Sequence, residues 1–351
     1  IFAVSLDDGT IKSGWPVVVD TAVPGFVSKG HNQRGALALQ NGILYVPYGG
    51  HNGDCGTYNG WVIGVNVSTP GMVKAFSTNM IGGGASRGGI WAVGGVASTL
   101  DGASLFVSTG NTGGVTTWAG GEAVLRLDPG PNFTNQTANE FYPTEWLAED
   151  MRDEDLGGAN PVVVELPGAP MGSQHLVIVP GKDGYLYVLN RDNLGGVGGQ
   201  LSRMAAGPQG QGGTGALKAA SAAYTTSQGT YVAYNINVNA MPASTGCPAA
   251  VSARSIGVAK ISGSPPTARV VWCTAESGMG SPIVTMTGTG DAIVWDANTH
   301  LYGYDGDTGA RVYAGPDAMA SPMQYFNTPI NAKGRIVVAT SGPGHLYVFK
   351  P

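Results

Sequence analysis

Polar side chains that could hold a ligand fall in two sets of short loops. The first set precedes the innermost predicted strand of successive repeats and contains His31, Gln33, Arg34, Arg87, Asp155, Asn160, Ser281, Gln324 and Asn327. The second set lies between the second and third strands of a repeat and contains His51, Asp54, Tyr58, Trp118, Lys182 and Asp183. Convergent groups of this kind bind small polar ligands or ions in a concave site. The competing interpretation is that they satisfy the backbone of turns and ordered water.

A metal ion could be held by His51, Asp54 and Tyr58, with His31 joining them. The two histidines lie 20 residues apart on different loops, which does not match a zinc-ligand spacing. The acidic run from Glu145 to Asp155 could bind calcium through hard carboxylate oxygens. It lacks the spacing of a calcium loop, however, which favours a solvated surface helix or loop. The sequence is therefore compatible with calcium but assigns no metal site.

No catalytic residue can be predicted from spacing. Neither a Ser/His/Asp set nor a carboxylate pair stands out for hydrolysis. Tryptophans could stack on a sugar or a quinone, or pack between sheets; they are Trp61, Trp91, Trp118 and Trp272.

A repeated unit of short strands positions these side chains. Its third strand begins near Ile1, Val62, Ala123, Tyr185, Ile256, Leu301 and Leu346, with gaps of 61, 61, 62, 71, 45 and 45 residues. About 45 residues is the size of a four-stranded propeller blade, and longer gaps hold inserted loops. Apolar residues alternate rather than recurring every three or four positions, which excludes helical repeats. We therefore predict an all-β chain in which residues 1–351 form one seven-bladed β-propeller of four-stranded antiparallel blades, with both loop sets converging on the central channel.

The end blade is predicted to be incomplete or to be closed by both termini. Residues 1–6 fit a third strand and residues 15–19 a fourth, whereas residues 326–330, 335–339 and 345–349 supply three strands at the other end. Three arrangements would complete the ring: sequence upstream of Ile1, pairing of the two termini, or strand addition from a neighbouring molecule. The last would make the end blade a self-association surface.

The repeats resemble the blade motif of the quinoprotein (PQQ-like) propeller family. Leu301-Tyr-Gly-Tyr-Asp-Gly-Asp-Thr-Gly and Ile1-Phe-Ala-Val-Ser-Leu-Asp-Asp-Gly-Thr are similar to its L-Y-A-L-D strand and D-x-x-T-G turn. Residues 33–61 resemble a bacterial and fungal branch of the family. The resemblance covers nearly the whole chain and implies a propeller, but its motifs identify blades rather than chemistry.

The resemblance also implies features of catalytic members that this chain does not reproduce. Those members typically have eight blades, a late Trp in each repeat, often an adjacent Cys–Cys pair, and a Glu/Asn/Asp calcium set with a catalytic Asp. Here seven units are predicted, Tyr313 takes the late position, and no two cysteines are adjacent. A calcium set cannot be assigned residue by residue.

Composition narrows the class of partner. Charged residues make up 12% of the chain, against about 25% in average proteins. The net charge of -5 and the lack of a basic cluster exclude a nucleic-acid partner. No apolar run approaches the roughly 18 residues of a membrane span.

Cysteines and glycosylation motifs indicate an exported protein. Cys247 and Cys273 flank two neighbouring predicted strands and are expected to form a disulfide, which leaves Cys55 over. N-glycosylation motifs begin at Asn66, Asn132 and Asn135. We therefore predict an extracellular or periplasmic glycoprotein.

The sequence favours a non-catalytic binding or assembly module, with a glycan or small molecule at the channel mouth and no cofactor. It could also be a repeating subunit of an oligomer or filament. The alternative is a PQQ- and calcium-dependent dehydrogenase with its site at the same mouth. An activity assay separates the two: turnover of alcohols or sugars by the purified chain with added PQQ, calcium and an electron-accepting dye would show the dehydrogenase.

Overall fold

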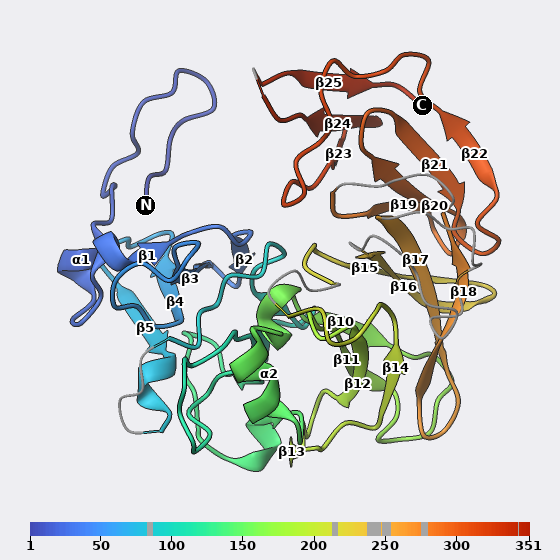
Figure 1. Cartoon of the computed structure of the whole chain (residues 1–351). Coiled ribbons are helices and arrows are strands. Elements are labelled where there is room, and N and C mark those ends of the chain that lie inside the picture. The colour runs from blue at the N-terminus through green and yellow to red at the C-terminus, as the bar shows by residue number, and fades with distance from the viewer. Residues whose placement is uncertain (83–86, 213–216, 237–246, 248–253, 275–279, 343) are drawn as a thin grey trace.

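The computed structural model describes residues 1–351 except 83–86, 213–216, 237–246, 248–253, 275–279 and 343. Within them the chain forms six sheets that follow one another around a common centre (Figure 1). The predicted all-β architecture is confirmed. The predicted count of seven four-stranded blades is not confirmed.

The first three sheets occupy the N-terminal part of the chain. The first contains β1 (His31–Asn32), β2 (Ala38–Gln40), β3 (Ile43–Gly50), β4 (Trp61–Asn66) and β5 (Val73–Ser77). The second contains β6 (Ala97–Ser98), β7 (Leu105–Ser108), β8 (Val124–Leu127), β9 (Glu140–Tyr142) and β13 (Gly196–Val197), which pairs parallel to β9. The third contains β10 (Val162–Glu165), β11 (His175–Pro180), β12 (Tyr185–Asn190) and β14 (Ser202–Ala205).

The last three sheets continue the series with antiparallel strands. The fourth contains β15 (Ala222–Thr226), β16 (Gly229–Ile236), β17 (Ser255–Ser262) and β18 (Thr267–Cys273). The fifth contains β19 (Ile283–Thr287), β20 (Gly290–Ala297), β21 (Leu301–Asp305) and β22 (Arg311–Ala314). The sixth contains β23 (Ile330–Ala332), β24 (Arg335–Ala339) and β25 (Leu346–Phe349).

The N-terminal segment differs from its predicted form. Residues 1–17 make a loose hairpin, with an isolated bridge between Val4 and Ile11 and a hydrogen bond from the Ile1 amino group to the Val17 carbonyl (2.8 Å). The strand predicted over residues 15–19 is wrong, because residues 15–18 belong to no strand and the helix α1 (Val19–Ala22) begins directly after them. In the sixth sheet, the first strand begins at Ile330 rather than at residue 326.

Helical structure is limited to short connections. Besides α1, the chain has α2 (Trp146–Arg152) and the 3-10 turns η1 (Ser28–Gly30), η2 (Thr78–Met80), η3 (Thr137–Asn139) and η4 (Leu156–Gly158). None of the helices within the described residues has the length and apolar character needed to cross a bilayer.

The core consists of layers between neighbouring sheets. Phe106 and Val124 of the second sheet pack with Val177 and Tyr187 of the third, while the opposite side chains of the third, such as Ile178, pack against the fourth. Both faces of a central strand are therefore buried, which explains why its sequence is apolar throughout.

The predicted disulfide is present. Cys247 and Cys273 are bonded, with their Cα atoms 5.7 Å apart, so residue 247 is held at the end of β18. Cys55 is a free, exposed thiol.

Candidate functional site

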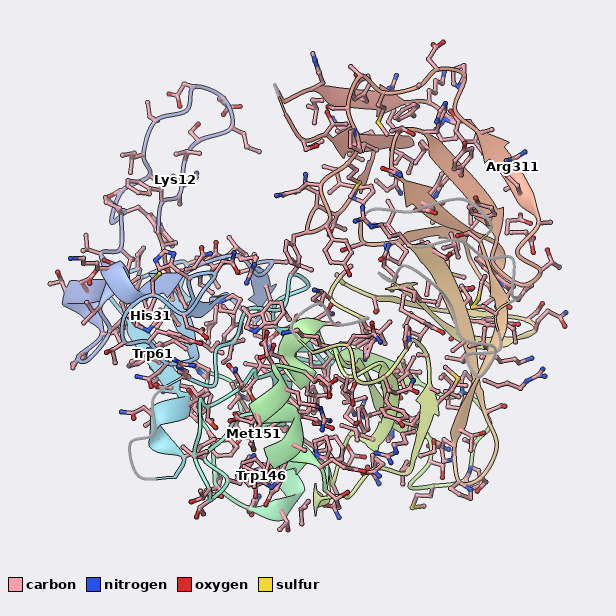
Figure 2. The ribbon with its side chains drawn as sticks, in the orientation of Figure 1. Lys12, His31, Trp61, Trp146, Met151 and Arg311 are labelled. Atoms are coloured by element: carbon pink, nitrogen blue, oxygen red, sulfur yellow. A yellow bond between two sulfur atoms is a disulfide. The ribbon has the colours of Figure 1, made fainter. Side chains whose placement is uncertain are left out.

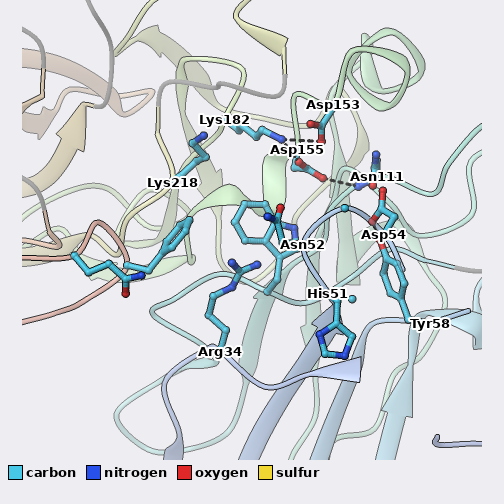
Figure 3. Close-up of a pocket in the computed structure, with 15 residues that line it drawn as sticks. Arg34, His51, Asn52, Asp54, Tyr58, Asn111, Asp153, Asp155, Lys182 and Lys218 are labelled. Carbon is cyan, nitrogen blue, oxygen red and sulfur yellow. Dashed lines mark hydrogen bonds and ion pairs between the residues drawn. The ribbon is translucent and has the colours of Figure 1, made fainter. Parts of the chain in front are cut away.

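A polar cavity lies where loops of several sheets meet near the centre of the ring (Figure 3). Its volume is about 510 Å³, within the roughly 300–1,000 Å³ of small-molecule sites. We call it the mouth cavity. It is lined by Arg34, Gly50, His51, Asn52, Gly53, Asp54, Tyr58, Trp91, Asn111, Asp153, Asp155, Lys182, Lys218, Gln324 and Phe326.

Five of the side chains predicted as ligand-binding line this cavity. They are Arg34, His51, Asp54, Asp155 and Gln324. Loops far apart in the sequence bring them together: Arg34 lies between β1 and β2, Asp155 precedes β10, and Gln324 precedes β23. Their role in binding a ligand stays a prediction.

The other six predicted side chains lie outside the lining and contact the protein itself. Gln33, Asn160 and Asn327 donate to the carbonyl oxygens of Gly35, Pro161 and Ala339. Ser281 Oγ accepts from the Ala220 backbone N–H at 3.0 Å. At these positions the polar side chain satisfies backbone groups.

His31 and Arg87 are the last two predicted side chains outside the lining, and both contact other residues of the protein. The His31 ring is buried and stacks on Phe26, with Nδ1 2.6 Å from the Val27 carbonyl and Nε2 accepting from the Asn59 N–H. Burial lowers the pKa of His31, which therefore favours the neutral ring. Arg87 pairs with Asp54 at 3.2 Å.

A buried ion triad forms one wall of the mouth cavity. Lys182 Nζ donates to Asp155 Oδ2 at 2.5 Å and to Asp153 Oδ1 at 2.7 Å. The side chains of Lys182 and Asp155 are each 5% exposed. Burial opposes ionisation of both groups, but their mutual attraction outweighs it, so the pKa of Asp155 is lowered and that of Lys182 is raised.

The helix α2 fixes this wall against the loop that follows β7. Asp150 accepts hydrogen bonds from the Thr112 backbone N–H, the Thr112 hydroxyl (2.9 Å) and the Gly114 N–H (3.1 Å). Asp155 Oδ1 accepts from the Asn111 N–H at 2.8 Å. The acidic run is only partly a solvated surface segment, because Glu149, Asp150, Glu154 and Asp155 are buried whereas Glu145 and Asp153 are exposed.

Arg34 projects into the mouth cavity between two aromatic rings. Its guanidinium carbon lies 4.9 Å from the ring centroids of both Trp91 and Phe326. Arg34 Nε is buried and has no hydrogen-bond partner among the described residues. Burial lowers the pKa of Arg34, and the nearby Asp155 partly offsets this effect.

Tyr58 and Asp54 form the opposite wall. The Tyr58 hydroxyl donates to Asp54 Oδ1 at 2.6 Å, while Asp54 Oδ2 faces Arg87. Burial, and then the bond to Asp54, raise the pKa of Tyr58, so the phenol stays protonated. Gly50 lies directly against the Tyr58 ring.

Asn111, Lys218 and Phe326 line the mouth cavity but were not predicted. Asn111 lies between the second and third strands of its sheet, so the rule that selected His51 and Lys182 could have found it. Lys218 and Phe326 lie in long connections where no motif marks them. Among the described residues, no three His, Cys, Asp or Glu side chains are grouped to hold a metal ion.

Comparisons with known proteins identify the fold. No protein-family model matches the chain, and no curated protein matches it in sequence. The structure is similar to a quinohemoprotein alcohol dehydrogenase from Comamonas testosteroni, at 15% identity and a TM-score of 0.57, covering 90% of this chain and 59% of that one. It is also similar to a europium-containing methanol dehydrogenase, at 13% identity and a TM-score of 0.57, covering 90% and 66%.

The alignment therefore spans less than two thirds of either dehydrogenase. Identities this low carry information about the fold and not about the activity. The similarity agrees with the blade motifs of the sequence, and the chain has the fold of the PQQ-like β-propellers.

Proposed function

We propose that this chain is a non-catalytic, extracellular β-propeller that binds a small polar ligand, such as a glycan unit, in the mouth cavity. The observation that carries this proposal is the convergence of side chains from the first, second, third, fourth and sixth sheets on one cavity. Arg34 comes from one end of the described chain and Phe326 from the other. A site built this way is held by the whole ring rather than by one loop.

The charges of the lining favour binding over acid–base catalysis. Asp54 is paired with Arg87, and Asp153 and Asp155 are paired with Lys182. Because its pKa is lowered, Asp155 is a weak base at neutral pH. An ion-paired carboxylate suits a fixed hydrogen-bond acceptor better than a proton carrier.

Support for export comes from the disulfide and from the exposed glycosylation motifs. Disulfides persist mainly in oxidising compartments. Asn132 and Asn135 are exposed and accessible to a glycosyltransferase.

Ligand screening against a cavity-filling variant tests the binding role. Asn52→Trp places a large side chain in the mouth cavity, and Asn193→Trp places the same side chain on an exposed loop elsewhere. We expect sugars or sugar acids to raise the Tm of the wild type and of Asn193→Trp, but not of Asn52→Trp. Equal shifts in all three proteins would place the binding elsewhere and contradict the proposal.

A PQQ- and calcium-dependent dehydrogenase is the second candidate. It is favoured by Asp54, Asn111 and Asp155, which line the same cavity as Trp91 and match side-chain types that the family resemblance implies for calcium and quinone. PQQ would supply a two-electron redox centre, and these residues would be the ones to hold it with its cation.

The donor set does not fit that cofactor as it stands. Asp155 uses one oxygen for Lys182 and the other for the Asn111 N–H, and Asp54 is engaged by Tyr58 and Arg87. The Lys182 ammonium already bridges Asp153 and Asp155, and Arg34 lies over the Trp91 ring. Oxidation of alcohols or sugars with added PQQ, calcium and an electron-accepting dye would overturn the non-catalytic proposal.

We also propose that the edge of β25 accepts a further strand. Among the described residues β25 pairs only with β24, and Leu346 and Val348 are 70% and 56% exposed. An unpaired strand edge with apolar side chains is a template for strand addition.

A further inference from the structure

The geometry points to a ligand that carries a carboxylate received by Arg34, and therefore to a sugar acid such as a hexuronate. This inference rests on the proposed function, since it names the ligand class of the mouth cavity.

Two aromatic rings flank the Arg34 guanidinium group. Its carbon lies over the Trp91 ring and over the Phe326 ring, 4.9 Å from each ring centroid. The guanidinium N–H groups lie in the plane of the group, and a carboxylate matches two of them side by side. The contacts with the two rings thus hold the cation in the cavity while its N–H groups serve an anion.

Arg34 is also short of hydrogen-bond acceptors. Among the described residues it makes no ion pair or hydrogen bond, and its buried Nε lacks a partner. A buried donor without a partner costs free energy, which a bound acceptor would recover. Lys182 differs, because its ammonium already donates to two carboxylates.

The ion pairs around the mouth cavity leave Arg34 as an available anion receiver. The lining contains three cations, Arg34, Lys182 and Lys218, and three carboxylates, Asp54, Asp153 and Asp155. All three carboxylates are engaged by cations other than Arg34: Asp54 pairs with Arg87, which lies outside the lining, and Asp153 and Asp155 pair with Lys182. A ligand carboxylate would therefore meet Arg34 without displacing an ion pair of the protein.

Neutral polar groups complete the lining and suit hydroxyl groups. Asn52, Asn111 and Gln324 present side-chain amides, which donate to and accept from hydroxyls. The half-exposed Asp153 side chain adds a further acceptor at the rim. One carboxylate next to several hydroxyls describes a sugar acid.

Titration with matched sugars tests the inference. The probes are D-glucuronate and D-galacturonate, with D-glucose and D-galactose as neutral counterparts, and the readout is calorimetry at low salt. We expect the uronates to bind at least about tenfold more tightly than the neutral sugars, as for a hydrogen-bonded ion pair.

Variants at Arg34 test whether this residue binds the carboxylate of the uronate. Arg34→Met keeps the apolar stem between the rings and should weaken uronate binding about 10- to 100-fold while leaving neutral sugars unchanged. Arg34→Lys should fall between Arg34→Met and the wild type, because its ammonium lacks the fork. Arg269→Met removes an exposed arginine on the outer strand β18 and should bind like the wild type. If Arg34→Met does not fold, Arg34→Lys and the salt dependence of wild-type binding give the same comparison.

Different results would contradict the carboxylate inference and the proposed ligand site. Equal affinity for uronates and neutral sugars, or unchanged uronate binding by Arg34→Met, would overturn the carboxylate inference. If PQQ or a neutral sugar bound instead, and Asn52→Trp abolished that binding, a ligand site at the mouth cavity would stand without a sugar acid. No saturable binding of any sugar, sugar acid or quinone would refute both.

Discussion

Lys182 holds together one wall of the mouth cavity. It is 5% exposed and holds the buried carboxylate of Asp155 as well as the partly exposed one of Asp153. Removing one partner of such a pair leaves a buried charge without compensation.

Lys182→Met should therefore destabilise the protein by about 3–5 kcal/mol. Adding Asp155→Asn should recover part of this loss, because the amide oxygen can still accept from Asn111 and no buried charge remains. Urea denaturation measures the change, and Lys350→Met, at an exposed terminal lysine, is the control. A loss below about 1 kcal/mol would mean that the triad is a surface pair in solution.

The raised pKa of Glu149 predicts how the free energy of unfolding changes with pH. Burial, and then the nearby Asp183, raise the pKa of Glu149 to about 9 from 4.5. The folded state thus holds a proton that the unfolded state releases, and this stabilisation is complete below pH 4.5 and is lost as the pH rises towards 9.

Glu149→Gln should remove the loss of stability that the wild type shows as the pH rises. Relative to wild type, the variant should gain up to about 1.4 kcal/mol for each pH unit above 4.5, with little difference at pH 4.5. Denaturation midpoints at pH 5, 7 and 9 provide the measurement. Asp7→Asn, an exposed carboxylate of the N-terminal hairpin, controls for net charge. Parallel pH profiles for wild type and Glu149→Gln would be the contrary result.

The three glycosylation motifs should differ in how often their asparagine carries a glycan. Asn135 and Asn132 are exposed, although the Asn132 amide donates to the Pro129 carbonyl at 2.7 Å. Asn66 is half-buried at the end of β4, where its side-chain oxygen accepts from the Ser68 and Thr69 N–H groups. Peptide mapping after expression in a eukaryotic secretory host should find a glycan at Asn135 first and none at Asn66. Glycan at Asn66 would show that this turn opens before modification.

The sequence revealed part of the candidate site through loop position. Arg34, Asp54 and Asp155 follow from the rule that loops at one end of each blade converge. It could not separate them from Gln33 or Asn160, because that distinction depends on which carbonyl oxygen lies within reach after folding. The stacking of Arg34 depends on Phe326, almost 300 residues away in the chain, and no local pattern encodes it.

At the scale of elements, α2 and the end of β3 shape the mouth cavity. α2 turns acidic side chains inward, where Asp150 binds the loop after β7. β3 ends in Gly49 and Gly50, which leave room for the side chains of Trp91 and Tyr58. Glycine is required at both positions, because a Cβ at Gly49 would overlap the Trp91 Cβ and a Cβ at Gly50 would overlap the Tyr58 ring.

Gly50→Ala should displace Tyr58 from Asp54 and cost about 1–3 kcal/mol, as overpacking does. Gly71→Ala is the matched control, since a Cβ there meets no atom within 4 Å. Thermal denaturation gives the stability difference. Equal Tm values for the two variants would show that Tyr58 relocates without cost.

The elements themselves were predictable to different extents. Alternating apolar residues mark β12 and β21, because each strand is buried on both faces. The first predicted unit has the same motif yet forms a hairpin, since residues 1–17 have no complete sheet to join in this structure. The acidic run fits a surface helix as well as a loop, and α2 forms there; the sequence did not reveal that Glu149 and Asp150 face inward, opposite to the usual pattern of a surface helix.

At the scale of the molecule, six sheets surround the mouth cavity and the ring is open on one side. The N-terminal hairpin exposes Phe2 and Leu6, and β25 exposes Leu346 and Val348. Figure 2 shows the hairpin, which carries Lys12, extending away from the sheets. Apolar side chains at both ends of the ring are consistent with the strand-addition proposal.

Charges on the β25 edge should prevent association. We expect the chain to sediment as a dimer or larger particle, and Leu346→Lys with Val348→Lys to sediment as a monomer. Val312→Lys, at an equally exposed position on β22 of a four-stranded sheet, should leave the mass unchanged. A monomeric wild-type chain at high concentration would contradict self-association.

The contacts of Arg34 with Trp91 and Phe326 join the loops of the first, second and sixth sheets at the hub, and among the described residues the outer edges of β5 and β25 pair with no further strand. Spreading the ends of the ring would pull Phe326 away from the guanidinium group and change the place where an anion docks. By thermodynamic reciprocity, a docked anion must then resist that spreading to the same extent. If the proposed anion binds at Arg34, its affinity and the closure of the ring should therefore change together.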